Sequence, residues 1–219
     1  MIEALRVLVK TFKDLWGEMF NLVLMNLATL ALMALIVPGP PAWVALHAVC
    51  HRIANDYAIR WEHYFQAFRQ HFWKAWLYAA ASGVAIALIA LNFWWYGATF
   101  GDQPWVQWVR GAWLAAGLFW AVVNFYIVPF YIEQTEKRWR IALRNALIIA
   151  GANPVFTLVL LAAGGLLMGI ALFFTPLFVF LGPAMWTLLS TEAVVNRVND
   201  WRKRMGMLEA PEGESPTRE

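Results

Sequence analysis

The chain has 219 residues, of which 61% are hydrophobic and only 14% are charged, with a formal net charge of +3. Charged residues make up about a quarter of an average soluble domain, so this composition excludes an ordinary soluble protein, whereas a bilayer accepts helices that are apolar on every face. The basic residues cluster at the ends of apolar segments, which indicates orientation in a membrane and excludes a nucleic-acid-binding protein. We therefore predict an all-α, polytopic transmembrane helical bundle.

The N-terminal segment, residues 1–17, is predicted to be an amphipathic interfacial helix. Apolar side chains recur at helical spacing over residues 2–16, with Lys and Arg on the other side. The stripe comprises Ile2, Leu5, Leu8, Phe12, Leu15 and Trp16. The segment has no signal-peptide layout, so the first long apolar span is expected to act as an uncleaved signal.

The transmembrane helical domain is predicted over residues 18–197. A helix needs about 20 apolar residues to cross the hydrocarbon core, and segments 19–37, 75–95, 113–132, 155–174 and 177–195 meet that length. The segment 41–55 is shorter and carries Arg52 near its end, so it is either a re-entrant helix or a sixth crossing whose Arg52 extends to the headgroups. The sequence thus predicts five to six spans.

Two further amphipathic segments are expected to lie at the membrane interface as elbow helices that lead into spans. They are residues 57–74 and residues 134–150, and the second has Glu133–Lys137 and Glu136–Arg140 at the favourable i,i+4 spacing. Gly165 and Gly169 form a small-residue pair that permits close helix contact, within the bundle or in a dimer. Residues 198–219 are predicted to be a cytoplasmic basic end followed by a disordered tail.

The distribution of basic residues predicts the orientation. If 41–55 crosses, all of the 17 Lys and Arg residues except Arg110 fall on the cytoplasmic side. If it does not cross, Arg6, Lys10 and Lys13 move outside. The positive-inside rule favours six passes with both termini in the cytoplasm of a bacterial inner membrane.

Several motifs, taken in order, resemble a known family. They are the apolar stretch Gly17 to Leu27 with its asparagines, the turn Pro38-Gly39-Pro40-Pro41, the elbow Tyr64-Phe65-Gln66-Ala67-Phe68-Arg69-Gln70-His71-Phe72, and the series Tyr126-Ile127-Val128-Pro129, Leu143-Arg144-Asn145 and Asn153-Pro154. The chain resembles the YesL-like family of bacterial integral membrane proteins, a domain of unknown function, although His71 stands where the family usually has Asn. The resemblance implies a plasma-membrane protein associated with carbohydrate utilisation, because relatives often accompany sugar ABC transporters.

Polar residues inside the predicted spans are the first candidates for a site. They are Asn26, Asn92, Asn124 and Glu192. Intramembrane asparagines commonly join helices by hydrogen bonds, and the alternative is a polar pathway. An intramembrane acid is expensive and is read as functional by default, but Glu192 lies about one turn before Arg197, so pairing with that arginine is the structural alternative to a proton or substrate contact.

Histidines offer no convincing metal site. His47 and His51 lie at i,i+4, a spacing that can share a metal, but a third ligand is missing and Cys50 points away from them. His63 and His71 are expected to be solvated on the elbow. No catalytic motif is present, so we predict no cofactor, no metal and no enzymatic activity.

Two functions remain as hypotheses. The first is an accessory or scaffold protein linked to carbohydrate uptake, which would dock a sugar ABC-transporter complex through its cytoplasmic elbows. The candidate docking residues are Arg60, Phe65, Phe68, Arg69 and Arg144. The alternative is a small transporter or permease subunit with a polar site at mid-membrane. The expected partners are the lipid bilayer and either such a complex or further copies of the chain, and not nucleic acid.

Overall fold

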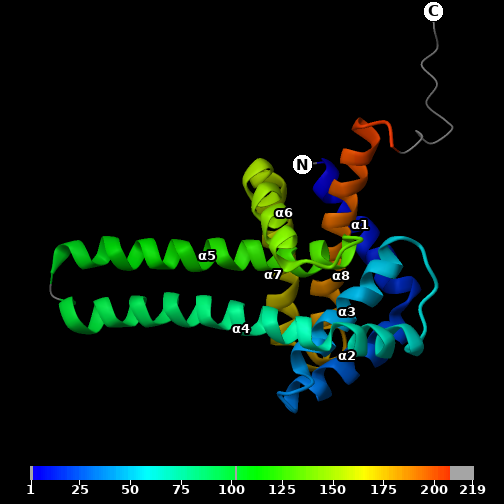
Figure 1. Ribbon diagram of the computed structural model, residues 1–219, viewed down its shortest axis with the longest axis horizontal. Helices are drawn as coiled ribbons and strands as arrows, with labels where there is room; N and C mark the ends of the chain where they lie inside the picture. The colour runs from blue at the N-terminus through cyan, green and yellow to red at the C-terminus, as the bar shows by residue number, and fades with distance from the viewer. Residues whose placement is uncertain (1, 102, 208–219) are drawn as a thin grey trace, which may run out of the picture.

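The computed structural model describes residues 2–101 and 103–207, and every secondary-structure element in those ranges is a helix (Figure 1). The helices are α1 (Ile2–Gly17), α2 (Met19–Ala34), α3 (Gly39–Ala54), α4 (Trp61–Phe100), α5 (Pro104–Glu133), α6 (Trp139–Ala152), α7 (Pro154–Phe173) and α8 (Thr175–Arg204). The predicted all-α class is confirmed. The tail predicted to be disordered lies outside the described residues from position 208 onward.

Four helices, α4, α5, α7 and α8, are long and apolar enough to cross a membrane. Helices α1 and α2 pass the same test only together, and they meet at a bend of 89°. Helix α3, the optional sixth crossing, has 16 residues, which span about 24 Å, less than the roughly 30 Å of a hydrocarbon core. By length and composition the described residues thus contain four candidate spans, or five if the bent pair is one span, so only the higher count reaches the lower bound of the predicted five to six.

The Pro-Gly-Pro-Pro turn ends α2 and starts α3. Ile36 adopts a left-handed φ of 62°, which ends the expected span 19–37 before its last residues. Pro40 and Pro41 occupy the first turn of α3, where a missing N–H costs nothing. A Cβ at Gly39 would lie 3.3 Å from the Met33 Cα, so glycine allows the two chain segments to approach closely. The turn therefore lays α3 against α2.

Helix α3 lies at the centre of the molecule and contacts α2, α4, α5 and α8. Most of its residues are buried, which explains why a helix too short to be an evident span is still strongly apolar. One hydrophobic core joins α2, α3, α4 and α8, and it includes Leu22, Met25, Leu46, Val49, Tyr64 and Leu188. Helix α3 therefore connects the four helices that pack around it.

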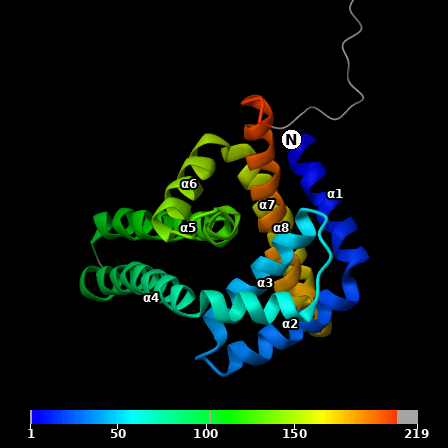
Figure 2. The same ribbon diagram turned by 45° about the vertical axis from the view of Figure 1, so that its right-hand side comes forward.

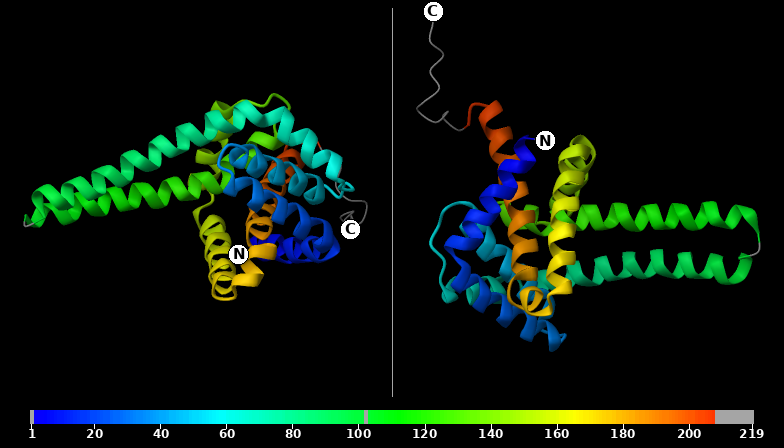
Figure 3. Two further views of the ribbon diagram at one scale, coloured as in Figure 1. Left: turned by 90° about the horizontal axis from the view of Figure 1, so that it is seen from below. Right: turned by 180° about the vertical axis from the view of Figure 1, so that it is seen from behind.

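Helices α4 and α5 form a long hairpin that projects away from the other helices (Figures 1 and 3). The predicted elbow 57–74 and span 75–95 are not separate, because α4 runs without a break for 40 residues from Trp61. Buried residues Tyr64, Ala67, His71 and Ala75 continue one stripe into the hairpin, which carries the helix past the expected elbow. The outer half exposes large apolar side chains, among them Val84, Ile86, Leu88, Leu91 and Trp94.

The chain leaves the hairpin through a loop that replaces part of the second predicted elbow. Residues 134–138 are not helical, so the expected Glu133–Lys137 pair on a helix surface does not form. Helix α6 starts at Trp139, whose ring stacks on Tyr131 at a centroid distance of 3.7 Å. The Trp139 indole N–H also donates to the Lys74 carbonyl at 2.8 Å. These contacts fasten the start of α6 to the base of the hairpin.

Helices α7 and α8 lie side by side and are joined at Phe174 (Figure 3). Their close contact occurs at Gly164, where a Cβ would lie 2.8 Å from the Leu189 side chain. A Cβ at Gly165 or Gly169 would have open space around it, so the predicted small-residue pair makes no close contact within the described bundle. Gly164, next to the predicted pair, makes the close contact between α7 and α8 instead.

Helix α1 packs along α8 (Figure 2). Its buried face is formed by Ala4, Val7, Thr11 and Leu15, at helical spacing. Of the predicted stripe, Leu5, Phe12 and Trp16 are instead exposed. The helix therefore has two apolar faces, one packed against the bundle and one exposed.

Candidate functional site

Asn26 repairs the break that Pro183 makes in α8. Proline has no N–H, so the helix loses a hydrogen bond to the carbonyl of Val179. The Asn26 amide nitrogen donates to the Val179 carbonyl at 2.8 Å and to the Phe180 carbonyl at 3.1 Å, and its oxygen accepts from the Ala184 N–H at 3.0 Å. Because Asn26 is fully buried, these bonds occupy its polar atoms in holding α2 to α8.

Asn124 joins the two helices of the hairpin near its base. Its oxygen accepts from the Tyr78 hydroxyl at 2.6 Å and from the Ser82 hydroxyl at 3.1 Å, while its nitrogen donates to the Trp120 carbonyl of its own helix. Asn92, farther out, donates only to the Leu88 carbonyl one turn earlier. The structure therefore places the three predicted asparagines at three separate points and brings none of them into a shared site.

Glu192 is buried and forms an ion pair with Lys10 of α1 at 2.7 Å. Lys10 also pairs with Asp14 at 2.9 Å and donates to the Ala54 carbonyl at 2.9 Å. The alternative partner, Arg197, instead pairs with Glu3 at 2.7 Å. Glu192 thus joins α1 to α8 and, through Lys10, reaches the end of α3.

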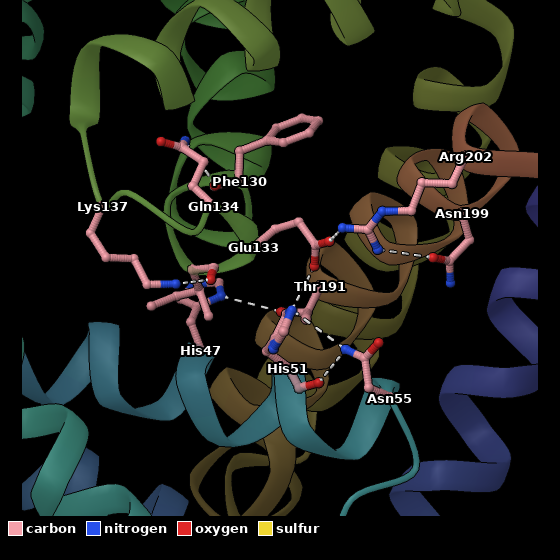
Figure 4. A network of polar contacts seen from close by, with 11 residues as sticks. His47, His51, Asn55, Phe130, Glu133, Gln134, Lys137, Thr191, Asn199 and Arg202 are labelled. Atoms are coloured by element: carbon pink, nitrogen blue, oxygen red, sulfur yellow. Dashed lines mark hydrogen bonds and ion pairs between the residues drawn. The ribbon is translucent and has the colours of Figure 1, made fainter. Parts of the chain in front are cut away.

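Glu133, the last residue of α5, is the centre of a second polar network (Figure 4). Its carboxylate contacts His51 Nε2 of α3 at 2.6 Å and Arg202 Nη2 of α8 at 2.7 Å. Asn55 donates to the His51 carbonyl at 2.8 Å, and Arg202 donates to Asn199 at 3.3 Å. One carboxylate therefore connects the ends of α3, α5 and α8.

A cleft of about 500 Å³ opens beside this network, between the end of α5, helix α6 and the last turns of α8. It is lined by Phe130, Glu133, Gln134, Thr135, Arg144, Asn145, Ile148, Ile149, Arg197, Val198, Trp201 and Arg202. We call it the α5–α6–α8 cleft. Three of the lining residues are arginines and five are apolar, so the cleft is amphipathic.

Lys137 lies in the loop between α5 and α6. Burial lowers the pKa of its ammonium group, the Glu133 carboxylate opposes this shift, and the Lys74 ammonium adds to it. Lys137 donates to the Ile132 carbonyl, and Lys74 donates to the Lys137 carbonyl at 3.3 Å. These contacts gather basic residues from α4 and from the loop before α6 on one side of the molecule.

The candidate docking residues do not form one surface. Phe65 and Arg69 line an open hollow of about 830 Å³ on the first turns of α4, together with Trp61, Glu62, Gln66 and Gln70. We call these six residues the α4 face. Arg60 is exposed just before it, and Phe68 is partly buried against the core of α2, α3 and α4. Arg144 lies on α6 and lines the α5–α6–α8 cleft instead.

The histidines have structural partners. His71 is buried and its Nδ1 lies 3.1 Å from the Tyr131 hydroxyl, so the expectation that it is solvated was wrong. His63 Nδ1 accepts from the Arg60 N–H at the start of α4. His47 lies 3.5 Å from the Thr191 hydroxyl, and His51 contacts Glu133. Over residues 2–101 and 103–207, no group of three metal-ligating side chains is found.

Sequence reasoning missed Lys10, Glu133 and the cleft arginines as members of polar clusters. Lys10 and Glu192 are 182 positions apart, and His51 and Glu133 are 82 apart, so local spacing carries no signal for either pair. The available hint was the presence of ionisable residues at the ends of strongly apolar helices, where such residues find partners.

Comparison with known proteins adds one finding. A family model described as a protein of unknown function, DUF624, matches residues 19–93, about a third of the chain. The match covers α2, α3 and most of α4, which are the helices around the central core. No curated protein and no solved structure matches the chain. The chain is therefore similar to DUF624 proteins over the segment that contains the Pro-Gly-Pro-Pro turn and the α4 face.

Proposed function

We propose that the protein is a YesL-like accessory protein of the bacterial inner membrane, which binds a partner through the α4 face and has no enzymatic activity. The observation that carries the proposal is the combination of exposed aromatic and charged groups on the outer side of a helix whose inner side is fixed. Phe65 is about half exposed, and Trp61 stacks with it at a centroid distance of 6.0 Å.

The inner side of this stretch is anchored at three points. Tyr64 is fully buried, and its hydroxyl lies 2.8 Å from that of Thr29 on α2. Ala67 is buried, and His71 contacts Tyr131 on α5. A surface held in this way loses little conformational freedom on binding, which favours affinity.

The composition of the α4 face suits a protein partner. Aromatic residues and arginine dominate the binding energy of protein interfaces. Arg69 is exposed and makes no ion pair within residues 2–101 and 103–207, so it is available to a carboxylate of the partner. The family resemblance suggests a sugar ABC-transporter complex as that partner, and the positive-inside rule puts the α4 face on the cytoplasmic side.

The alternative function, a small transporter, has less support. It requires polar side chains that converge on a cavity at mid-membrane. Asn26 and Asn124 instead form hydrogen bonds with backbone and hydroxyl groups of neighbouring helices. Glu192 pairs with Lys10.

Photo-crosslinking from the α4 face in native membranes tests the proposal. A photoreactive amino acid at Phe65 should give an adduct with another protein, and the same amino acid at Leu88 serves as the control, because Leu88 is similarly exposed but lies on the outer half of the hairpin. An adduct of twice the chain mass would indicate a homo-oligomer instead. Absence of any adduct specific to position 65 would contradict the docking function.

Cysteine labelling tests the orientation. Replacing Cys50, which is buried, with alanine and then replacing the exposed Lys13 with cysteine gives a single reactive thiol on α1. Lys13 is preferred over Lys10 because Lys10 holds Glu192. A membrane-impermeant maleimide should label this thiol only after the cells are opened. Labelling of intact cells would place α1 outside.

A further inference from the structure

The α5–α6–α8 cleft has a basic end built from two helices. Arg144 comes from α6, and Arg197 and Arg202 come from α8. Arg144 is exposed and makes no ion pair within the part of the chain that the structure describes. Glu133 is the acidic residue among those lining the cleft, and its two oxygens are already engaged by His51 and Arg202. The cleft therefore retains a positive group without a counter-charge.

Arg197 provides a second, independent indication of a ligand. Its side chain is nine-tenths buried, and its guanidinium lies 3.8 Å above the Phe156 ring. One Nη atom contacts Glu3 at 2.7 Å and Asp200 at 3.5 Å. Its Nε is buried and has no hydrogen-bond partner among the described residues. A buried donor without an acceptor is rare in folded proteins, and this one belongs to a residue that lines the cleft.

Five of the other residues that line the cleft are apolar. They are Phe130, Ile148, Ile149, Val198 and Trp201. Ile148 and Trp201 are more than half exposed, and the nearby start of α7 exposes Val155 and Leu158. Apolar side chains are thus exposed on α6 and at the start of α7 as well as in the cleft. A soluble anion needs only the arginines, whereas a lipid also needs apolar surface for its acyl chains.

We infer that the α5–α6–α8 cleft binds an anionic phospholipid, with the phosphate between Arg144, Arg197 and Arg202 and the acyl chains along α6 and α7. Basic pockets between transmembrane helices at the cytoplasmic side are suited to anionic headgroups, and arginine matches the geometry of a phosphate group. Asn145 and Thr135 line the same end and offer further donors. The bound lipid would fill the wedge between the base of the hairpin and α8.

Native mass spectrometry of the purified full-length protein tests this inference. The protein in a mild detergent is titrated with phosphatidylglycerol, with phosphatidylcholine and, separately, with inorganic phosphate. We expect one phosphatidylglycerol molecule to remain bound, with an affinity at least tenfold above that for phosphatidylcholine. Equal retention of the two lipids would overturn the lipid assignment. So would retention of inorganic phosphate without retention of phosphatidylglycerol.

Matched variants locate the site. Arg144→Gln removes the unpaired cleft arginine without breaking an internal contact, and it should weaken phosphatidylglycerol binding at least fivefold. Arg140→Gln is the control, because Arg140 is also an exposed arginine of α6 without an ion pair among the described residues but does not line the cleft. It should change binding by less than twofold. An equal loss in both variants would indicate diffuse attraction to a basic surface and would refute the site.

Discussion

The outer half of the α4–α5 hairpin and the rest of the molecule are held together in different ways. We call the rest the body: it comprises α1, α2, α3, α6, α7 and α8 with the inner ends of α4 and α5. In the body, polar side chains connect helices that are distant in sequence, as Lys10–Glu192, Asn26–Val179 and His51–Glu133 illustrate. Beyond Ser82, the described hairpin has no such bond between its helices apart from aromatic and cation–π contacts near its tip. Hydrogen bonds and ion pairs between helices therefore occur where short or broken helices meet. The two long helices of the hairpin's outer half are held together by apolar and aromatic contacts instead.

The tip of the hairpin shows what replaces those bonds. Tyr96 and Phe100 of α4 pack against Trp105 of α5, with centroid distances of 6.3 and 5.6 Å. Arg110 lies 4.5 Å from the centroid of the Phe93 ring. Aromatic residues of this kind favour the interface between headgroups and hydrocarbon. The composition of the tip is thus typical of a membrane–water interface.

The largest effect is expected at the Lys10–Glu192 pair of the body. Lys10→Met leaves the buried Glu192 carboxylate without its cation, and breaking a buried ion pair in this way costs about 3 kcal/mol. Unfolding of the detergent-solubilised protein, followed by circular dichroism, measures this loss. The double variant Lys10→Met/Glu192→Leu should recover most of it. Strict additivity of the two single changes would mean that the pair does not join α1 to α8.

Asn26→Leu is expected to have the next largest effect. It leaves the carbonyls of Val179 and Phe180 and the N–H of Ala184 without their partner beside Pro183, at a cost of about 2 kcal/mol. The same unfolding measurement applies. Substituting Pro183 with alanine in the Asn26→Leu background should restore stability, because the helix then supplies its own hydrogen bond. A failure to restore it would show that Asn26 acts in some other way.

The smallest effects are expected in the hairpin. Asn124→Leu removes the acceptor of Tyr78 and Ser82 and should cost about 1 kcal/mol. Asn92→Leu removes only a bond within one turn of α4 and should cost less than about 0.5 kcal/mol. Asn92 is therefore the matched control for the other asparagines. A loss at Asn92 equal to that at Asn26 would remove the distinction between hairpin and body.

Composition and periodicity predicted the class of the molecule and most of its spans. They could do so because the bilayer sets the length and polarity of a crossing helix. The proline-rich turn was also readable, since proline is favoured in turns and in the first turn of a helix, where Pro40 and Pro41 lie. The sequence did not predict that α4 is uninterrupted. The amphipathic stripe of Tyr64 and Ala67 is the same for an interfacial helix and for a helix packed on α3.

The polar partners were not predictable for a different reason. Glu192 had Arg197 one turn away in sequence, yet the buried carboxylate is satisfied by Lys10 from the other end of the chain. Which partner prevails depends on how α1 packs on α8, and that packing rests on small residues such as Ala4, whose pattern is weak in the sequence. The candidate site therefore became visible only with the arrangement of the helices.

The most direct measurement of the central claim separates partner binding from stability. The claim is that the α4 face binds a partner, whereas the buried polar residues hold the bundle together. Phe65→Ala/Arg69→Glu and Asn26→Leu are compared for protein recovered by affinity purification from native membranes and for unfolding. We expect the first variant to lose at least tenfold in co-purified partner at unchanged stability, and the second to lose stability but, once folded, to keep the partner. Full partner recovery by the Phe65→Ala/Arg69→Glu variant would contradict the account.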